Sequence, residues 1–270
     1  MDTVNTIVYE RKQNMSSSVF PIKAFNDNYI WCLRNQTHCA VVDPGDAAPV
    51  IAFCHDNKLT LSAIIITHHH WDHTGGIDAL LDAFPNIPVY GPQNKEIKQI
   101  TVRLSQGDEL ELPKLGVKFS VLEVPGHTLD HIAYYGDIGL FCGDTLFSAG
   151  CGRLFEGSPQ QMFTSLAKLT ALPADTEVYC THEYTMANIA FAEAVEPNNQ
   201  ALIDYKHWAK QQRTVNAPTL PSNIHRELAV NPFLRCHSAE LITNVSNNIG
   251  SPLVSEEAIF ASLRSWKDNF

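Results

Sequence analysis

The chain has 270 residues, of which 44% are hydrophobic and 18% are charged. This length and composition exclude the disordered class and allow a substantial buried core. The formal net charge of -10 at pH 7 argues against nucleic acid as the main partner. No apolar run approaches the ~20 residues that a membrane-spanning helix needs, so we expect no membrane partner either.

The cysteine content and the first residues indicate a compartment. Seven cysteines, an odd number without paired spacing, favour a reducing environment. Residues 1–15 are polar and lack the apolar centre of a signal peptide. We therefore expect a cytoplasmic protein. Because residues 1–15 have no periodicity, we expect a disordered extension there, with Met15 as an alternative start.

The rest of the chain divides into a mixed part and a helical part. Ser158 and Pro159 suit the N-cap and first position of a helix over Gln160–Leu169. Short apolar and β-branched runs predict strands at Val19–Lys23, Tyr29–Leu33, His38–Val42, Ala63–Ile66, Val89–Gly91, Val117–Leu122, Ile132–Tyr135 and Leu140–Cys142. Helical spacing follows at Met186–Val195, Asn199–Arg213 and Glu256–Trp266. We expect an α/β domain over residues 16–182 and a smaller helical domain over 183–270.

The most informative segment is His68–His73, which has the pattern His-x-His-x-Asp-His. Three imidazoles and one carboxylate are the ligands that Zn and similar metals prefer. The segment follows Leu61–Ile66, a run typical of a buried strand, and precedes Ile77–Phe84, which has helical spacing. A polar loop that merely contains histidines is the alternative, and this strand-turn-helix context disfavours it.

The spacing within this segment suggests two metal positions. Residues two apart in an extended stretch point to the same side, so His68 and His70 can reach one ion together. Asp72 and His73 follow after the chain turns, so they can face a second point nearby.

Three further strand ends carry candidate ligands. His127 follows the Val117–Leu122 run, Asp144 follows Leu140–Cys142, and His182 follows the apolar run at 178–180. Each residue alone is more often a turn or capping residue. Together they form a stronger pattern, because ligand-bearing loops at one edge of a sheet are where sites usually lie.

These motifs resemble the metallo-β-lactamase superfamily and, within it, the glyoxalase II (hydroxyacylglutathione hydrolase) family of bacterial type. The resemblance covers nearly all of residues 16–270. Besides the metal motif, it is carried by Phe25–Trp31, Val42–Gly45, Gly143–Phe147, Gly150–Gly157, Thr181–Thr185 and Leu263–Asp268. It implies an α/β fold, the four-layer αβ/βα sandwich of the superfamily, with a C-terminal helical domain that binds the substrate.

The resemblance also implies a ligand set for two divalent metal ions. It places His68, His70 and His127 on the first ion and Asp72, His73 and His182 on the second, and Asp144 bridges both together with a water or hydroxide. The implied catalytic residues are Asp144, Asp72 and His73. Nitrogen and oxygen donors suit Zn best and also admit Fe or Mn.

Three further residues are expected to have roles other than binding a metal ion directly. His69 is expected to point away from the ions, and His131 is more often structural than a ligand in such a position. Asp43 either orients a ligand histidine or shapes its own turn, and both readings stay open.

The implied reaction is hydrolysis of S-(2-hydroxyacyl)glutathione, with S-D-lactoylglutathione as the expected substrate. A metal-bound hydroxide would release glutathione and D-lactate, which is the second step of methylglyoxal detoxification. Two cations ~3.5–4 Å apart lower the pKa of bound water to about 7. A thiolate, whose conjugate acid has a pKa near 8.5, leaves without a general acid.

Four residues are implied to bind the glutathione thioester: Arg153, Phe155, Tyr184 and Arg235. Phe155 stands where some relatives have Tyr, so one hydroxyl contact is missing. Arg235 would grip the glycine carboxylate through its guanidinium. No Lys follows it closely, although eukaryotic relatives have one there. A solvated surface arginine is the alternative for Arg235.

Four other functions fit the sequence less well. Asp144 replaces the Cys or Ser of metallo-β-lactamases proper, which argues against β-lactam hydrolysis. A single-iron persulfide dioxygenase of the superfamily would use only the first ligand set, and a non-catalytic metal- or thiol-binding protein would have a closed site. An RNA-processing nuclease is disfavoured by the acidic balance. Because nothing in the helices demands a dimer, we expect a monomer.

Overall fold

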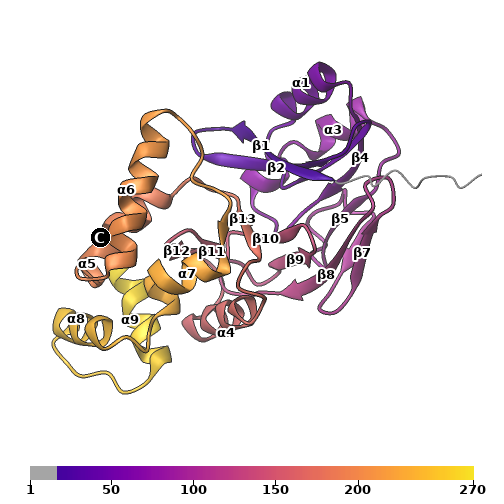
Figure 1. The fold of residues 1–270 in the computed structure, drawn as a ribbon. Helices are drawn as coiled ribbons and strands as arrows, with labels where there is room; N and C mark the ends of the chain where they lie inside the picture. The colour runs from indigo at the N-terminus through magenta and orange to yellow at the C-terminus, as the bar shows by residue number, and fades with distance from the viewer. Residues whose placement is uncertain (1–16) are drawn as a thin grey trace, which may run out of the picture.

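The structure is a computed structural model that describes residues 17–270 (Figure 1). The expectation for residues 1–15 lies outside the described residues. Two mixed six-stranded sheets form the centre of the N-terminal part of the chain. The first has the order β1 (Ser18–Ala24), β2 (Asn28–Arg34), β3 (His38–Val42), β4 (Thr60–Ile65), β5 (Val89–Pro92) and β6 (Val102–Leu104). The second has the order β14 (Ser222–Asn223), β13 (Glu177–Cys180), β10 (Gly139–Gly143), β9 (Ile132–Gly136), β8 (Val117–Glu123) and β7 (Glu109–Leu112).

An aromatic core joins the two sheets. Trp31 of β2 packs edge-on against Tyr179 of β13 with ring centroids 4.9 Å apart, and Tyr179 stacks on Phe141 of β10 at 4.8 Å. The Trp31 indole also donates to the Cys180 carbonyl at 2.9 Å. Because the Trp31 indole N–H has this acceptor, the large Trp31 side chain is buried between the two sheets without an unpaired polar atom.

Helices cover the outer faces of the sheets, which completes four layers. On the first sheet α1 (Ala47–Asn57) and α3 (Ile77–Ala83) bury Val50 and Leu80 against the outer side chains of the strands. Below the second sheet lies α4 (Pro159–Thr170), which begins with the expected Ser158 cap and a full capping box (Figure 1). The expected αβ/βα sandwich is confirmed.

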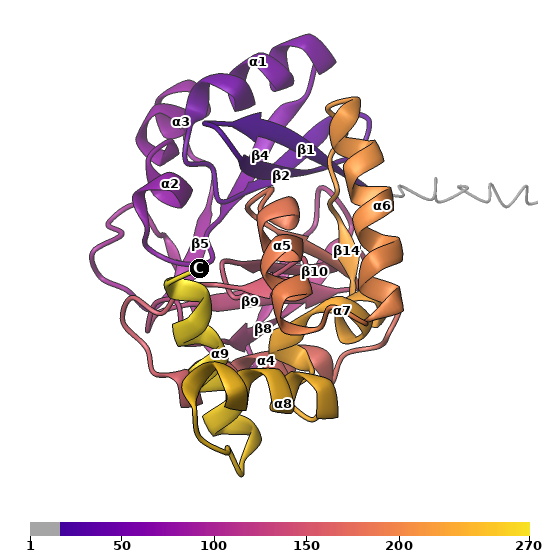
Figure 2. The same ribbon diagram turned by 90° about the vertical axis from the view of Figure 1, so that its left-hand side faces the viewer.

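The C-terminal part is helical, as expected, and gathers at one end of the sandwich (Figures 1 and 2). Its elements are α5 (Thr185–Val195), α6 (Gln200–Thr214), α7 (Ile224–Val230), the short 3-10 helix η1 (Pro232–Leu234), α8 (Ala239–Ile249) and α9 (Glu256–Asp268). One difference is β14, whose two residues extend the second sheet by pairing with β13. Within residues 17–270 no helix is both long and apolar enough to cross a membrane.

The topology brings four strand ends to one place. β3 runs parallel to β4, and β10 runs parallel to β13, so the carboxyl ends of each pair lie together. The two sheets meet at this edge, where Tyr29 near the start of β2 donates its backbone N–H to the Thr181 carbonyl at 2.7 Å. Gly143 permits this crowding, since it has φ 48° and a side chain there would lie 2.3 Å from the Thr67 hydroxyl.

A buried carboxylate ties the helical part to the loop that follows β11 (Leu146–Phe147). Glu227 of α7 is fully buried and accepts hydrogen bonds from the Ala149 backbone at 2.8 Å, Ser148 Oγ at 3.1 Å and Asn231 Nδ2 at 3.1 Å. Ser222 of β14 donates to the same carboxylate. Burial raises the pKa of Glu227 above its ordinary value, and these donors compensate the loss of hydration.

Glu227→Ala should therefore lower the free energy of unfolding by about 3 kcal/mol, because several buried donors lose their acceptor. Urea unfolding followed by circular dichroism measures this loss. Glu257→Ala is the control, because that carboxylate is exposed and contacts only Gln160 among the described residues; its effect should stay within about 0.5 kcal/mol. Equal effects of the two substitutions would contradict the role given to Glu227.

Candidate metal centre

The His68–His73 segment changes conformation in the middle, as the spacing predicted. Thr67 and His68 continue from β4, and the one-turn helix α2 (Trp71–Thr74) begins directly after His70. His68 and His73 are fully buried, whereas His70 is half-buried. The turn at His70 therefore separates His68 from Asp72 and His73, and of these three only Asp72 is partly open to solvent.

Seven predicted ligands come together as two groups with one shared member. One group is His68, His70 and His127, and the other is Asp72, His73 and His182. Within each group the donor atoms lie within 4.8 Å of one another. Asp144 lies between them. Its Oδ2 is 3.4 Å from His127 Nε2 and 3.3 Å from His182 Nε2, and its Oδ1 is 3.4 Å from His73 Nε2.

The donor atoms fit a pair of divalent cations. His68 Nε2, His73 Nε2 and Asp144 Oδ1 are buried and make no hydrogen bond within the described part of the chain. An unpaired buried polar atom costs about 1–3 kcal/mol, so three at one point call for a further partner. Imidazole nitrogen and carboxylate oxygen are ligands of divalent transition metals. The protein has a divalent metal site here.

Burial prepares the first group for a metal. It lowers the pKa of His68 well below its ordinary value, and the neighbouring histidines lower it further. Burial also lowers the pKa values of His70 and His127. All three rings are therefore neutral near pH 7, which is the form of imidazole that binds metals.

Carboxylates dominate the second group. Burial disfavours the charged form of His73, but Asp144 and Asp43 outweigh it and raise the pKa of His73 to about 10. Asp144 and Asp72 likewise outweigh burial at His182 and raise its pKa to about 12. The same histidines hold the pKa values of Asp72 and Asp144 below the ordinary range, against the effect of burial. A divalent cation bound to this group would take the place of the protons that the carboxylates favour on His73 and His182.

In four of the five ligand histidines, all except His70, the Nδ1 atom contacts an oxygen atom that fixes the orientation of the ring. His68 Nδ1 lies 3.1 Å from the Thr67 hydroxyl, and His127 Nδ1 lies 2.8 Å from the Arg153 carbonyl. Asp43 does orient a histidine: its Oδ2 is 3.0 Å from His73 Nδ1 and also accepts from the Thr67 hydroxyl at 2.7 Å.

Two supporting residues escaped the sequence analysis. Asp27 Oδ1 is 2.8 Å from His182 Nδ1, and Asn28 Nδ2 donates to Asp72 Oδ2 at 3.0 Å. Both belong to the Phe25–Trp31 motif, which the resemblance quoted without a role for either side chain. Asp27 lies near His182 because the two sheets meet there, whereas Asn28 of β2 and Asp72, which follows β4, come from the same sheet.

The other two histidines near the site are not aimed at the donor groups. His69 pairs with Asp130 at 2.9 Å and with Glu156 at 3.4 Å, so it points away as expected. His131 is buried, stacks on the His68 ring at 4.6 Å and accepts the Asp144 backbone N–H at 3.1 Å. Its contacts are structural.

Two of the predicted substrate residues lie on opposite sides of the donor groups. The Phe155 ring is 62% exposed and stands edge-on to His70 and His127, with centroids 5.5 and 5.3 Å away. Tyr184 is 37% exposed and stacks on the His182 ring at 4.6 Å. An exposed aromatic side chain therefore flanks each group.

The two predicted arginines already have acidic neighbours. Arg153 Nε is 3.4 Å from Asp268 at an exposed position. Arg235 binds the buried Glu196 through Nε at 2.8 Å and Nη2 at 3.1 Å, which is a bidentate pair. Substrate binding by Arg235 stays a prediction, and it requires a carboxylate to compete with Glu196.

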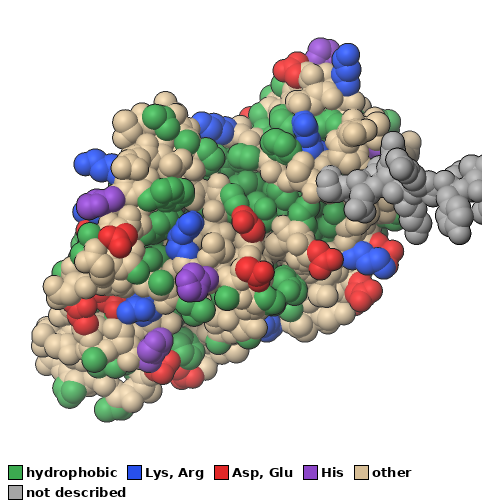
Figure 3. All heavy atoms as spheres, viewed as in Figure 1, with side chains coloured by type: hydrophobic (Ala, Val, Ile, Leu, Met, Phe, Trp, Pro, Cys, Tyr) green, Lys and Arg blue, Asp and Glu red, His purple; other side chains and the backbone are tan. Residues whose placement is uncertain are grey.

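The face of the molecule drawn in Figure 3 has no single continuous patch of positive charge. Figure 3 shows Lys and Arg side chains interspersed with Asp and Glu over that face. With a net charge of -10, the binding of any anionic ligand would rest on a few local cations.

Comparison with known proteins places the chain among relatives along nearly its whole length. Residues 25–182 match the model of the metallo-beta-lactamase superfamily, and residues 183–270 match that of the hydroxyacylglutathione hydrolase C-terminus. The hydroxyacylglutathione hydrolase of Nitrosomonas europaea is 51% identical over 253 residues, which are 94% of this chain and 96% of that protein. That of Aliivibrio salmonicida is 54% identical over 250 residues, covering 92% and 98%.

Solved structures share the fold. The B3 metallo-beta-lactamase BLEG-1 superposes with a TM-score of 0.59 at 25% identity, covering 81% of this chain and 99% of that one. ETHE1 from Myxococcus xanthus gives a TM-score of 0.60 at 23% identity, covering 93% and 97%. With the two family models and relatives above 50% identity, the conclusion is that the chain belongs to the hydroxyacylglutathione hydrolase family of the metallo-beta-lactamase superfamily.

Proposed function

We propose that this protein hydrolyses the thioester of S-(2-hydroxyacyl)glutathione, with S-D-lactoylglutathione as the substrate, to glutathione and a 2-hydroxy acid. The observation that carries the proposal is the pair of donor groups that share Asp144. Membership of the hydroxyacylglutathione hydrolase family supports the same reaction. The complete second group, with His73 and His182 both directed at Asp144, disfavours the single-iron alternative.

The chain supplies the means to hold two divalent ions side by side. His68, His70 and His127 would hold the first ion, Asp72, His73 and His182 the second, and Asp144 would contact both. Bound there, the ions would lower the pKa of a coordinated water to about 7 and would polarise the thioester carbonyl. Three neutral imidazoles in the first group favour Zn, although the oxygen donors of the second group also accept Fe or Mn.

The residues around the ions would orient the thioester. Phe155 and Tyr184 flank the two groups, so the reacting carbon lies between two aromatic rings. Arg153 and Arg235 would attract the carboxylates of glutathione. The departing thiolate has a conjugate acid with a pKa near 8.5, so no side chain has to protonate it.

Three further proposals concern the domains, the oligomeric state and the compartment of the protein. We propose that residues up to 182 carry the catalytic groups and that residues 183–270 bind most of the glutathione. A monomer suffices, because both donor groups come entirely from one chain. We also propose that it works in the cytoplasm, where its seven buried cysteines would stay reduced, as the structure has them.

Thiol release from S-D-lactoylglutathione tests the proposal. The purified protein should release free thiol rapidly, lose the activity on treatment with a chelator and regain it when Zn is added back, because the reaction needs the ions. Ellman's reagent measures the thiol. A fully metal-loaded protein that releases no thiol would contradict the substrate assignment.

Asp144→Ala should lower kcat by about 100-fold or more, since even a residue that only supports a metal ligand contributes 10–100-fold. The fold should survive, because the substitution removes a carboxylate with an unpaired buried oxygen. Asp137→Ala is the matched control: this exposed aspartate lies in the turn at the opposite end of β10. Undiminished turnover in Asp144→Ala would exclude the shared position of Asp144.

Arg235→Ala should raise KM while leaving kcat nearly unchanged, because the arginine would contact glutathione far from the scissile bond. It should also lower the free energy of unfolding by about 3 kcal/mol, since buried Glu196 loses its partner. Steady-state kinetics and urea unfolding separate the two effects. A loss of stability with an unchanged KM would make Arg235 purely structural.

A further inference from the structure

The turn between β1 and β2 contacts two of the three residues in the second donor group. Asp27 Oδ1 lies 2.8 Å from His182 Nδ1, and the next residue, Asn28, donates to Asp72 Oδ2 at 3.0 Å. His182 and Asp72 come from different sheets and are 110 positions apart in the sequence. A single turn therefore sets the position of both side chains.

Backbone contacts keep this turn in register with the ligands. Glu183 donates its N–H to the Asp27 carbonyl at 2.8 Å, Tyr29 donates to the Thr181 carbonyl at 2.7 Å, and Asn28 pairs with His182 as an isolated bridge. These contacts lie on both sides of His182. The Asp27 carboxylate is thus presented to the ring by a backbone that cannot slide along β13.

The second donor group differs from the first in what supports its histidines. A hydroxyl and a backbone carbonyl, both uncharged, lie behind His68 and His127. Carboxylates lie behind His73 and His182, from Asp43 and Asp27 respectively. A carboxylate behind a ligand histidine fixes its ring and strengthens its donor nitrogen, and losing such a partner typically lowers metal affinity 10–100-fold.

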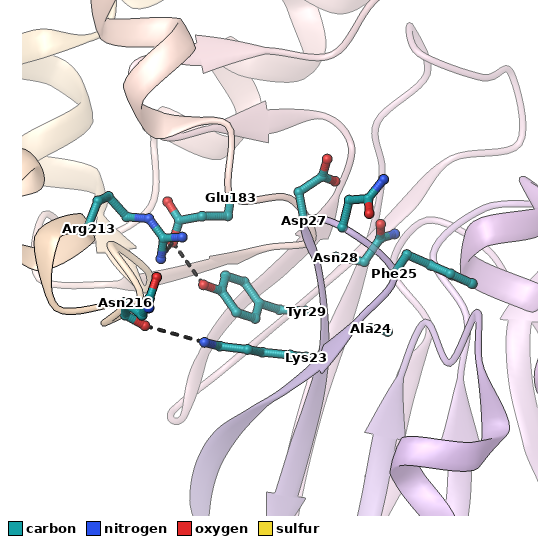
Figure 4. A pocket seen from close by; sticks show the side chains of 10 residues that line it. Lys23, Ala24, Phe25, Asp27, Asn28, Tyr29, Glu183, Arg213 and Asn216 are labelled. Carbon is teal, nitrogen blue, oxygen red and sulfur yellow. Dashed lines mark hydrogen bonds and ion pairs between the residues drawn. The ribbon is translucent and has the colours of Figure 1, made fainter.

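Asp27 is the more accessible of these two carboxylates. Its side chain is 37% exposed, whereas that of Asp43 is 2% exposed and also accepts from Thr67. Figure 4 shows Asp27 and Asn28 along one wall of a cavity of about 300 Å³, opposite Arg213 and Asn216. Changing Asp27 therefore does not open a gap in the hydrophobic core.

We infer that Asp27 is a positioning residue for the second metal ion, acting through His182, and that Asn28 acts in the same way through Asp72. The β1–β2 turn then sets how tightly the second ion is held, and the first ion is held independently of it. The inference rests on the two-ion site of the proposed function. It assigns to the Phe25–Trp31 motif a role in metal retention.

The experiment is a chelator competition on Asp27→Asn. Asparagine has nearly the same shape and can still accept from His182 Nδ1, so only the charge is lost. The Zn-loaded wild-type protein should hold two ions per chain. In Asp27→Asn, one ion should be lost at a free chelator concentration at least about 10-fold lower, while the other keeps its wild-type affinity. Elemental analysis after gel filtration counts the ions without any thioester substrate, so a failed thioesterase assay leaves this result intact.

A matched control is Asp130→Asn. Its carboxylate lies 2.9 Å from His69 Nδ1, almost the same contact as that of Asp27, but His69 belongs with Asp130 and Glu156 to a separate cluster outside the two donor groups assigned to the ions. Both ions should keep their wild-type affinity in this variant. Thermal unfolding of the two metal-free variants shows whether either substitution alters the fold itself.

Two further variants extend the test, and the first leaves Asp27 unchanged, so the inference stays falsifiable if Asp27→Asn unfolds. Asn28→Ala should also weaken only the second ion. In a His182→Ala background, adding Asp27→Asn should change the affinity for the second ion less than twofold, because the ring through which Asp27 acts is gone. Equal weakening of both ions, or the same effect of Asp27→Asn with and without His182, would overturn the inference.

Discussion

The structure depends on one electrostatic constraint: imidazoles and carboxylates are crowded at a buried point where water cannot solvate them. His68, His73 and Asp144 each place an unpaired polar atom there. Burying such atoms is unfavourable unless a partner compensates them. A divalent cation would compensate several at once, so folding and metal binding should be thermodynamically coupled in this protein.

The sandwich meets this constraint through its parallel strand pairs. β3 with β4 and β10 with β13 end at the same place, and the segment after β8 brings His127 there, so the side chains arrive without a long excursion of the chain. Contacts between Tyr29 and Thr181 bind the two sheets at that edge. The helical part closes the arrangement from one end, where Glu227 holds the loop after β11. Each of these features positions donors, and none performs chemistry alone.

The ligands could be predicted from the sequence because strand ends and local spacing carry the information. His68–His73 has a turn at its middle, and His127, Asp144 and His182 each follow an apolar run, so the pattern is visible without coordinates. Helices such as Met186–Val195 were visible for the same reason, through their 3.6-residue periodicity. Helices α1 and α7 were not predicted, although α1 has an ordinary aspartate cap at Asp46.

Contacts between distant segments could not be predicted in this way. Asp27 lies 155 positions from His182, and no local pattern links the two. Glu196 is likewise invisible as the partner of Arg235, because the pair joins α5 to the segment after η1. β14 is only two residues long and exists because β13 offers it an edge. Such features follow from tertiary packing rather than from propensity.

Anomalous diffraction from Zn-loaded crystals would test the two-ion centre, because it locates each ion without reference to activity. We expect two peaks per chain, one among His68, His70 and His127 and the other among Asp72, His73 and His182, with Asp144 in contact with both. A single peak, or a second peak away from Asp144, would contradict the two-ion centre on which the proposed function rests.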